Sequence, residues 1–252
     1  MSDLFRLGKK PARPGAVQLR LGTYLDRPAL PTPPAVFGEE ALWPADWGLL
    51  GNDLYADCCW AGADHESMLW GAMGGVRAVF TKATALADYS SAAGFDFSDA
   101  STDQGTDLQA AASYRRKTGI IDAAGNRHLI GAYAAIEPGN LEEHLTAAWL
   151  FGACGVGLTI GDNQIQQFLA GQPWDGQLGP NSGGHYVPLI GFRGGYLLVV
   201  TFGKVQQMTP EFLVANEDEA LAYLSTEALK DGDGPTGLDL VALTADLAAL
   251  TA

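Results

Sequence analysis

Two cysteines and a distant histidine are the residues of this chain whose types and placement suit covalent chemistry. Cys58 and Cys59 stand at the start of a run with helical periodicity, and His185 opens an apolar strand much later in the chain. A thiol becomes a nucleophile when a histidine holds it ionised and later donates a proton to the leaving group. The start of a helix also lowers the pKa of a thiol. The pairing predicts a thiol hydrolase.

The segments around these residues resemble the papain-like cysteine peptidase superfamily, whose nucleophilic cysteine opens a central helix. Cys59-Trp60-Ala61 is similar to the Cys-Trp-Ala of that family, and Gly184-His185-Tyr186-Val187 is similar to the Gly-His-x-Val around its catalytic histidine. The resemblance covers about residues 48–210. It implies an α+β fold in which a central N-terminal helix packs against a twisted antiparallel β-sheet or barrel lobe.

The resemblance leaves two candidates for the nucleophile. In the family, a glutamine six residues before the cysteine donates to the oxyanion. Asn52 occupies that position relative to Cys58, and Asp53 occupies it relative to Cys59. An asparagine amide donates a hydrogen bond to an oxyanion, whereas an ionised aspartate repels it. This favours Cys58, while the Cys-Trp-Ala similarity keeps Cys59 as the alternative nucleophile.

A third group must orient the histidine. Sixteen residues after His185 lies Thr201, in the position where the family usually has an asparagine. A threonine hydroxyl accepts a hydrogen bond from imidazole, but more weakly. Phe202-Gly203 is similar to the Trp-Gly that shields this hydrogen bond in the family, one residue early. The implied catalytic set is Cys58, His185, Asn52 and Thr201.

Charge is distributed unevenly along the chain. The net charge is −14, yet residues 1–27 hold six basic and two acidic residues, and the remainder holds nine basic and 27 acidic residues. The acidic body argues against a nucleic-acid partner, which requires basic surface. A basic arm on an acidic body is expected to dock on its own body, on a neighbouring copy or on another acidic partner.

Several classes of protein and of site are not expected. The N-terminus is too short and too polar for a secretory signal, and no apolar run suits a membrane span. Three cysteines make no disulfide framework, which favours an intracellular origin with reduced thiols. The cysteines and the four histidines have no zinc-ligand spacing, so neither a metal nor another cofactor is predicted.

The predicted elements divide the chain into three parts. An extended proline-rich arm is expected over 1–40, a papain-like domain over 41–215 and a helical extension packed on that domain over 216–252. Apolar periodicity predicts helices and strands. The helices are 58–87, interrupted at Gly74-Gly75, and 107–117, 141–151, 162–170, 217–229 and 238–250; the strands are 120–136 around a turn, 156–160, 186–192 and 196–202.

Two functions from different classes fit these features. The first is a hydrolase of peptide, isopeptide or cell-wall amide bonds. The second is a structural protein of a virus particle that reuses the fold, because the arm and the Gly8-Lys9-Lys10-Pro11-Ala12-Arg13-Pro14 segment also resemble uncharacterised bacteriophage and prophage proteins. In that case the arm 1–27 would bind neighbouring subunits in a homo-oligomer or larger assembly. The expected location is cytoplasmic, or within a virus particle.

Overall fold

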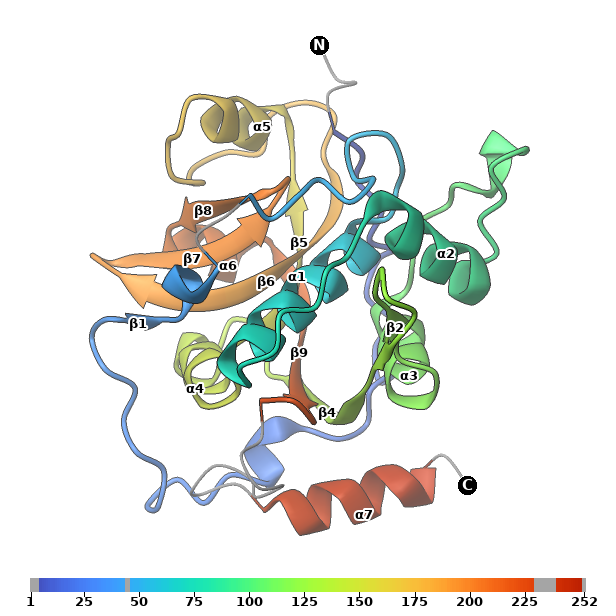
Figure 1. Cartoon of the computed structure of the whole chain (residues 1–252). Coiled ribbons are helices and arrows are strands. Elements are labelled where there is room, and N and C mark those ends of the chain that lie inside the picture. Colours follow the sequence, from blue (N-terminus) through green and yellow to red (C-terminus); the bar gives the residue numbers. More distant parts are fainter. Residues whose placement is uncertain (1–4, 44–45, 229–238, 251–252) are drawn as a thin grey trace.

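A buried helix packed against an antiparallel sheet forms the centre of the molecule (Figure 1). The structure is a computed structural model and describes residues 5–43, 46–228 and 239–250, with the side chains of 247–250 outside the description. The central helix is α1 (Cys58–Met73), which begins at the candidate nucleophile. Every residue of α1 from Cys58 to Gly71 is buried, so its polar side chains need partners inside the protein.

The main sheet has seven strands, and all of their pairings are antiparallel. Six strands follow the order β4-β9-β5-β6-β7-β8, and β1 pairs with β6. Their bounds are β1 (Phe37–Gly38), β4 (Ile130–Ile136), β5 (Cys154–Ile160), β6 (Gly183–Arg193), β7 (Tyr196–Thr201), β8 (Lys204–Met208) and β9 (Glu217–Ser225). A separate two-stranded ribbon joins β2 (Ile120–Ile121) and β3 (Arg127–His128).

The remaining helices surround α1 and the sheet (Figure 1). Helices α2 and α3 lie on one side of α1, with α5 and α6 beside the opposite end of the sheet. The bounds are α2 (Lys82–Ala93), α3 (Leu108–Lys117), α4 (Leu141–Phe151), α5 (Asp162–Leu169), α6 (Pro210–Asn216) and α7 (Leu240–Leu250), with short 3-10 helices η1 (Leu21–Thr23), η2 (Glu40–Leu42) and η3 (Ala100–Thr102). No helix in the described ranges is long and apolar enough to cross a membrane.

Local sequence signals position most of these elements as predicted. Asp107 caps α3 by accepting the N–H of Ala110, and Asn140 caps α4 by accepting the N–H of Glu143. The predicted α+β architecture, with a helix against an antiparallel sheet, is confirmed. The second part of the first predicted helix starts later than expected, because Gly74 ends α1 and the capping box at Thr81 starts α2.

The helix predicted over 217–229 is wrong. Residues Glu217–Ser225 form β9, which lies between β4 and β5 in the main sheet. Its residues from Ala220 to Ser225 are buried on both faces. A strand covered on both sides has a continuous apolar run, and periodicity cannot distinguish such a run from a buried helix. The turn expected at 231–235 lies outside the described residues.

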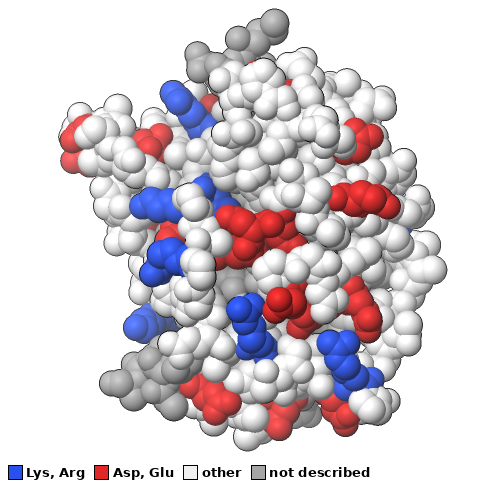
Figure 2. All heavy atoms as spheres, turned by 180° about the vertical axis from the view of Figure 1, so that it is seen from behind, with Lys and Arg blue, Asp and Glu red and all other residues white. Residues whose placement is uncertain are grey.

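The basic arm lies against the acidic body of its own chain. Three of its arginines form ion pairs with body carboxylates: Arg13 with Asp107, Arg20 with Glu137 and Arg27 with Glu142. Lys9 pairs with Asp218 and Glu219. Figure 2 shows Lys and Arg side chains beside groups of Asp and Glu side chains on the rear face. The charge asymmetry of the sequence therefore corresponds to contacts within one chain.

Candidate active site

The two sequence segments singled out for their chemistry meet where α1 begins. Asn52, Cys58, Tyr186 and Thr201 line one small cavity, and His185 lies on β6 immediately before Tyr186. Cys58 is the first residue of α1 and Thr201 is the last residue of β7. The pairing of β6 with β7 and the packing of α1 on the sheet thus bring together residues that are far apart in the sequence.

His185 and Thr201 form a buried hydrogen-bonded pair. The distance from His185 Nε2 to Thr201 Oγ1 is 2.8 Å, which leaves Nδ1 of the imidazole available to the Cys58 thiol. Phe202 stacks on the imidazole, with ring centroids 4.7 Å apart and an interplanar angle of 21°. Phe202 has a φ of +45°, an uncommon conformation for a residue with a side chain. The tight turn between β7 and β8 thereby holds the ring against His185.

The surroundings of Cys58 favour the thiolate. Burial alone raises the pKa of the Cys58 thiol, but the neighbouring Cys59 thiol, the imidazole of His185 with its charge, and the backbone of Tyr186 hold that pKa well below its ordinary value. The position at the start of α1 acts in the same direction, because the helix dipole stabilises negative charge there. The thiol therefore has the electrostatic environment of a nucleophile.

Cys59 has a different environment. Its Sγ lies 3.7 Å from the carbonyl oxygen of Thr106, which accepts from the thiol. Burial and the neighbouring Cys58 raise the pKa of Cys59 well above its ordinary value. Cys59 does not line the cavity that contains Cys58 and Asn52. The geometry thus favours Cys58 over Cys59, in agreement with the oxyanion-donor argument. Cys154 is buried in β5, away from the cavity.

Asn52 lines the same cavity as Cys58, but its side-chain amide already donates hydrogen bonds elsewhere. Its Nδ2 donates to the carbonyl oxygen of Arg6 over 2.8 Å and to that of Tyr55 over 3.3 Å. The Arg6 N–H in turn donates to the backbone oxygen of Asn52. A carbonyl oxygen of the N-terminal arm therefore occupies the donor that the sequence assigns to an oxyanion.

The arm covers the rest of the candidate site. The ring of Phe5 stacks on Phe202 at 4.0 Å between centroids and also contacts Phe168. Cys58 and His185 are each only 1% exposed, and the cavity beside them holds about 10 Å³. That volume suits about one water molecule and no substrate group. The site is closed in this conformation, and a substrate requires displacement of the arm.

Two further polar residues lie close to Cys58 in the sequence, one at the N-cap of α1 and one buried within the helix. Asp57 occupies the N-cap position but makes no side-chain cap; burial raises its pKa well above the usual value, which favours its neutral form and reduces negative charge beside the thiol. The Nε2 atom of His65 faces the backbone oxygens of Trp47 and Gly48, and burial lowers the pKa of His65 to about 4. His65 is therefore neutral and structural.

Sequence reasoning missed the residues of the arm that contact the site. The sequence predicts only a basic, proline-rich arm over Phe5, Arg6 and Lys9, whereas their positions in the site are set by three-dimensional contacts. Asp218 and Glu219, which pair with Lys9, fell within a segment predicted as a helix. The uneven charge was the available signal, since it indicated that arm cations would meet body carboxylates.

Solved structures share this architecture. The chain is similar to xylellain, a cysteine protease from Xylella fastidiosa, over 90% of its own length and 98% of the xylellain chain, with 11% identity and a TM-score of 0.64. The chain is also similar to procathepsin B S9 from Trypanosoma congolense, over 87% of its own length and 86% of the other chain, with 11% identity and a TM-score of 0.59. The Carica candamarcensis cysteine protease CMS1MS2 matches over 76% and 98%, with 10% identity and a TM-score of 0.56. The chain has the papain-like fold.

This identification rests on structure rather than on sequence. No protein-family model matches the chain, and no curated protein matches it. At 10–11% identity the solved structures show the papain-like fold alone. The predicted papain-like architecture is confirmed, and the chemistry of the site has to be argued from its own geometry.

Proposed function

We propose that this protein is a cysteine-dependent hydrolase of peptide or amide bonds. Cys58 is the nucleophile, His185 the acid and base, Thr201 the group that orients His185, and Asn52 the oxyanion donor. The observation that carries the proposal is the buried hydrogen-bonded pair of His185 and Thr201 beside a thiol whose pKa is held low. The papain-like fold supports it, because solved structures with this fold include cysteine proteases.

The reaction would proceed in two steps. The Cys58 thiolate attacks the carbonyl carbon of the substrate, and Asn52 Nδ2 and the Cys58 backbone N–H stabilise the oxyanion. His185 gives its proton to the leaving nitrogen as the carbon–nitrogen bond breaks, which leaves a thioester on Cys58. Water then attacks the thioester and passes a proton to His185, the carboxylic acid leaves, and the thiolate is restored.

The closed cavity makes this a latent hydrolase. Arg6 occupies the oxyanion donor and Phe5 covers Phe202, so catalysis requires the arm to leave the site. Binding of neighbouring subunits by the arm 1–27, and a place in a virus particle, stay predictions. Peptide substrates are the class that the fold favours.

The pH dependence of Cys58 alkylation tests the proposal. Iodoacetamide is added to the full chain across a pH series, and the labelled cysteines are mapped by mass spectrometry. Opening of the arm changes the labelling rate of Cys58 by a common factor across the pH series. The pH at which labelling rises instead reports the pKa of the Cys58 thiol. We expect Cys58 to label well below the ordinary thiol pKa of about 8.5, and His185→Ala to move the profile up towards that value.

The control is the labelling of Cys59 and Cys154 in the same digests, whose raised pKa values predict little reaction. A profile for Cys58 centred near the ordinary thiol pKa in both the wild-type protein and His185→Ala would overturn the proposal. Low-pH labelling of Cys59 in place of Cys58 would reassign the nucleophile.

A further inference from the structure

The N-terminal arm crosses the candidate site as an extended peptide held by backbone hydrogen bonds. The Lys9 N–H donates to the Gly184 carbonyl oxygen over 3.0 Å, on one side. On the other side, the Lys10 N–H donates to the Thr106 oxygen over 3.0 Å and the Thr106 N–H donates to the Gly8 oxygen over 2.8 Å. Such bonds hold any extended backbone, whatever its side chains. Specificity must therefore come from the side-chain contacts.

Lys9 makes the most selective of these contacts. Its Nζ lies 2.6 Å from Asp218 Oδ1 and 3.0 Å from Glu219 Oε1, and it donates to the Lys10 carbonyl oxygen over 2.9 Å. The Lys9 side chain is only 1% exposed. An ammonium group is rarely buried to this extent unless carboxylates surround it. The two carboxylates therefore form a binding site for a cationic side chain.

The body has room for this side chain because two positions lack a Cβ. A Cβ at Gly157 on β5 would lie 2.1 Å from Lys9 Cε, and a Cβ at Gly184 would lie 2.2 Å from the Lys9 carbonyl oxygen. Any residue larger than glycine would exclude the lysine stem at the first position and the peptide backbone at the second. The channel to the carboxylates thus exists in the body and is not created by the arm.

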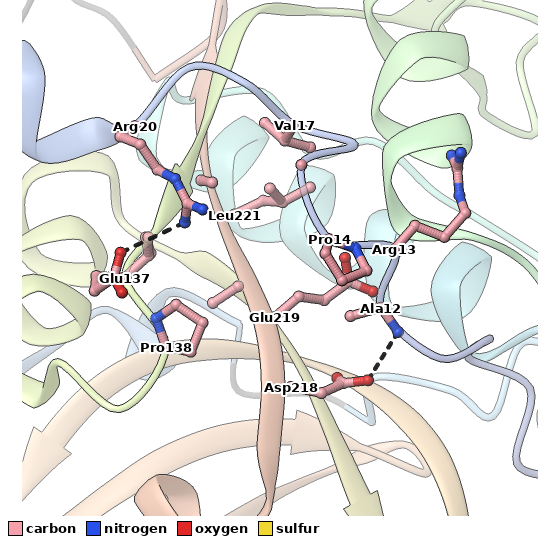
Figure 3. A pocket seen from close by; sticks show the side chains of 14 residues that line it. Ala12, Arg13, Pro14, Val17, Arg20, Glu137, Pro138, Asp218, Glu219 and Leu221 are labelled. Carbon is pink, nitrogen blue, oxygen red and sulfur yellow. Dashed lines mark hydrogen bonds and ion pairs between the residues drawn. The ribbon is translucent and has the colours of Figure 1, made fainter.

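The carboxylates also border solvent on their other side. A cavity of about 270 Å³ lies between the arm and β9, and Asp218 and Glu219 line it (Figure 3). Asp218 points across it to accept the Ala12 N–H, as the dashed line marks. This cavity leaves the two carboxylates accessible to water when Lys9 withdraws. Both would remain as acceptors for another cation.

We propose that Asp218 and Glu219 form a specificity pocket for a lysine or arginine side chain, and that Lys9 occupies it as an internal ligand. The substrate class is then a peptide whose backbone replaces residues 8–10 and whose basic side chain replaces that of Lys9. The proposal rests on the proposed function, because it names the substrate of that same site. It also explains why the pocket and the oxyanion donor are filled by one segment of the chain.

Equilibrium binding tests the pocket without chemistry. The full chain carries Lys9→Met to loosen the arm and Cys58→Ala to prevent reaction. The probe is the fluorescent hexapeptide Phe-Arg-Leu-Gly-Lys-Lys, with the sequence of residues 5–10, and versions with arginine, norleucine or glutamate in place of the first lysine. We expect the lysine and arginine peptides to bind at least about tenfold more tightly than the norleucine peptide, about 1.4 kcal/mol.

Carboxyl variants identify the source of the selectivity. Glu219→Gln with Asp218→Asn is expected to reduce the preference for lysine over norleucine to about twofold, because the neutral amides keep the shape and lose the charge. The matched control is Glu137→Gln, which removes one charge from the same cavity but does not contact Lys9. Circular dichroism of each variant confirms the fold before binding is compared.

The outcomes separate this proposal from the proposed function. Equal affinity for lysine and norleucine peptides, no binding of any peptide, or selectivity unchanged by the carboxyl variants would overturn the basic pocket. Low-pH alkylation of Cys58 would still support the hydrolase. Selective peptide binding without low-pH alkylation would instead support the pocket and refute the nucleophile.

Discussion

Two buried ion pairs differ in the part of the protein that supplies the cation: the body in one pair, the N-terminal arm in the other. In the interior, Arg115 of α3 lies 2.6 Å from Glu66 of α1, and these side chains are 2% and 0% exposed. At the candidate site, Lys9 of the arm is just as buried at 1%, but its partner Asp218 is 38% exposed. The interior pair joins two helices of the body. The pair at the site joins the body to the N-terminal arm.

Their surroundings sharpen this difference. The guanidinium of Arg115 lies over the rings of Trp70 and Tyr223, and Tyr186 donates to Glu66 over 2.6 Å. These contacts fix the interior pair from several sides. Lys9 has carboxylates at its tip and glycines along its stem, which is an arrangement that another side chain can enter. Equal burial of the cation therefore does not mean an equal role in folding.

Replacement of each cation by methionine should have different main effects. Arg115→Met should chiefly lower stability, and Lys9→Met should chiefly raise the reactivity of Cys58. Arg115→Met leaves Glu66 without its cation in a fully buried position, and breaking such a pair costs about 3–5 kcal/mol. We expect that loss in the free energy of unfolding, measured with urea. The exposed Lys117→Met, at the end of the same helix, is the control and should change little.

The double variant Glu66→Met with Arg115→Met makes this test more discriminating. Replacement of both charges by apolar side chains often restores stability, because no unpaired charge remains. A double variant as unstable as Arg115→Met would contradict the pairing of these two residues as the source of the loss.

Lys9→Met should have a smaller effect on folding and a larger effect on the site. Since Asp218 is partly exposed and water can reach both carboxylates, we expect a loss of about 1 kcal/mol in stability, at the upper end for solvent-screened pairs. The arm would open more often, and Cys58 should react about fivefold faster with iodoacetamide at neutral pH. The measurement is the labelling rate of Cys58 by mass spectrometry.

Lys10→Met is the matched control for this prediction, because Lys10 is the exposed neighbour in the same segment. An equal acceleration in both variants would show that the arm is held by overall charge and not by the Lys9 pair. No acceleration in Lys9→Met would show that this pair does not control access to Cys58.

The sequence predicted the residues of the candidate site better than it predicted how the N-terminal arm lies over them. Cys58 and His185 carry the residue types, and Asn52 and Thr201 the spacings, that the family resemblance implies, so their meeting could be predicted from residues far apart. The pairing of Lys9 with Asp218 and Glu219 could not, because charge asymmetry says that an arm will dock and not where. Only the path of the backbone past Gly184 and Thr106 decides that.

Elements were predictable where local chemistry marks them. The caps at Asp107 and Asn140 and the glycine turn between β6 and β7 have short-range signals. Strand β9 has none, since its apolar run from Ala220 to Leu224 is explained only by its neighbours β4 and β5. That error also concealed the carboxylates of Asp218 and Glu219, which precede the run.

A third buried pair extends the comparison to pH and should give the smallest effect of the three. His144 of α4 lies 2.8 Å from Glu217 of β9, and both side chains are fully buried. Burial lowers the pKa of His144, but the hydrogen bond and charge of Glu217 outweigh it and raise that pKa above the usual 6.5. The folded state therefore binds the proton more tightly than the unfolded state.

The sign of the pH dependence follows from this difference. Below the unfolded pKa the contribution of the pair to stability is fully present, and it is lost as the pH rises through the raised folded pKa. We expect the free energy of unfolding to fall as the pH rises above the usual imidazole pKa of about 6.5, and His144→Gln to flatten that fall because an amide does not titrate. Urea unfolding across a pH series measures both slopes. An unchanged slope in His144→Gln would assign the titration to another group, and it would leave Arg115 with Glu66 as the only one of these pairs that holds body elements together by charge.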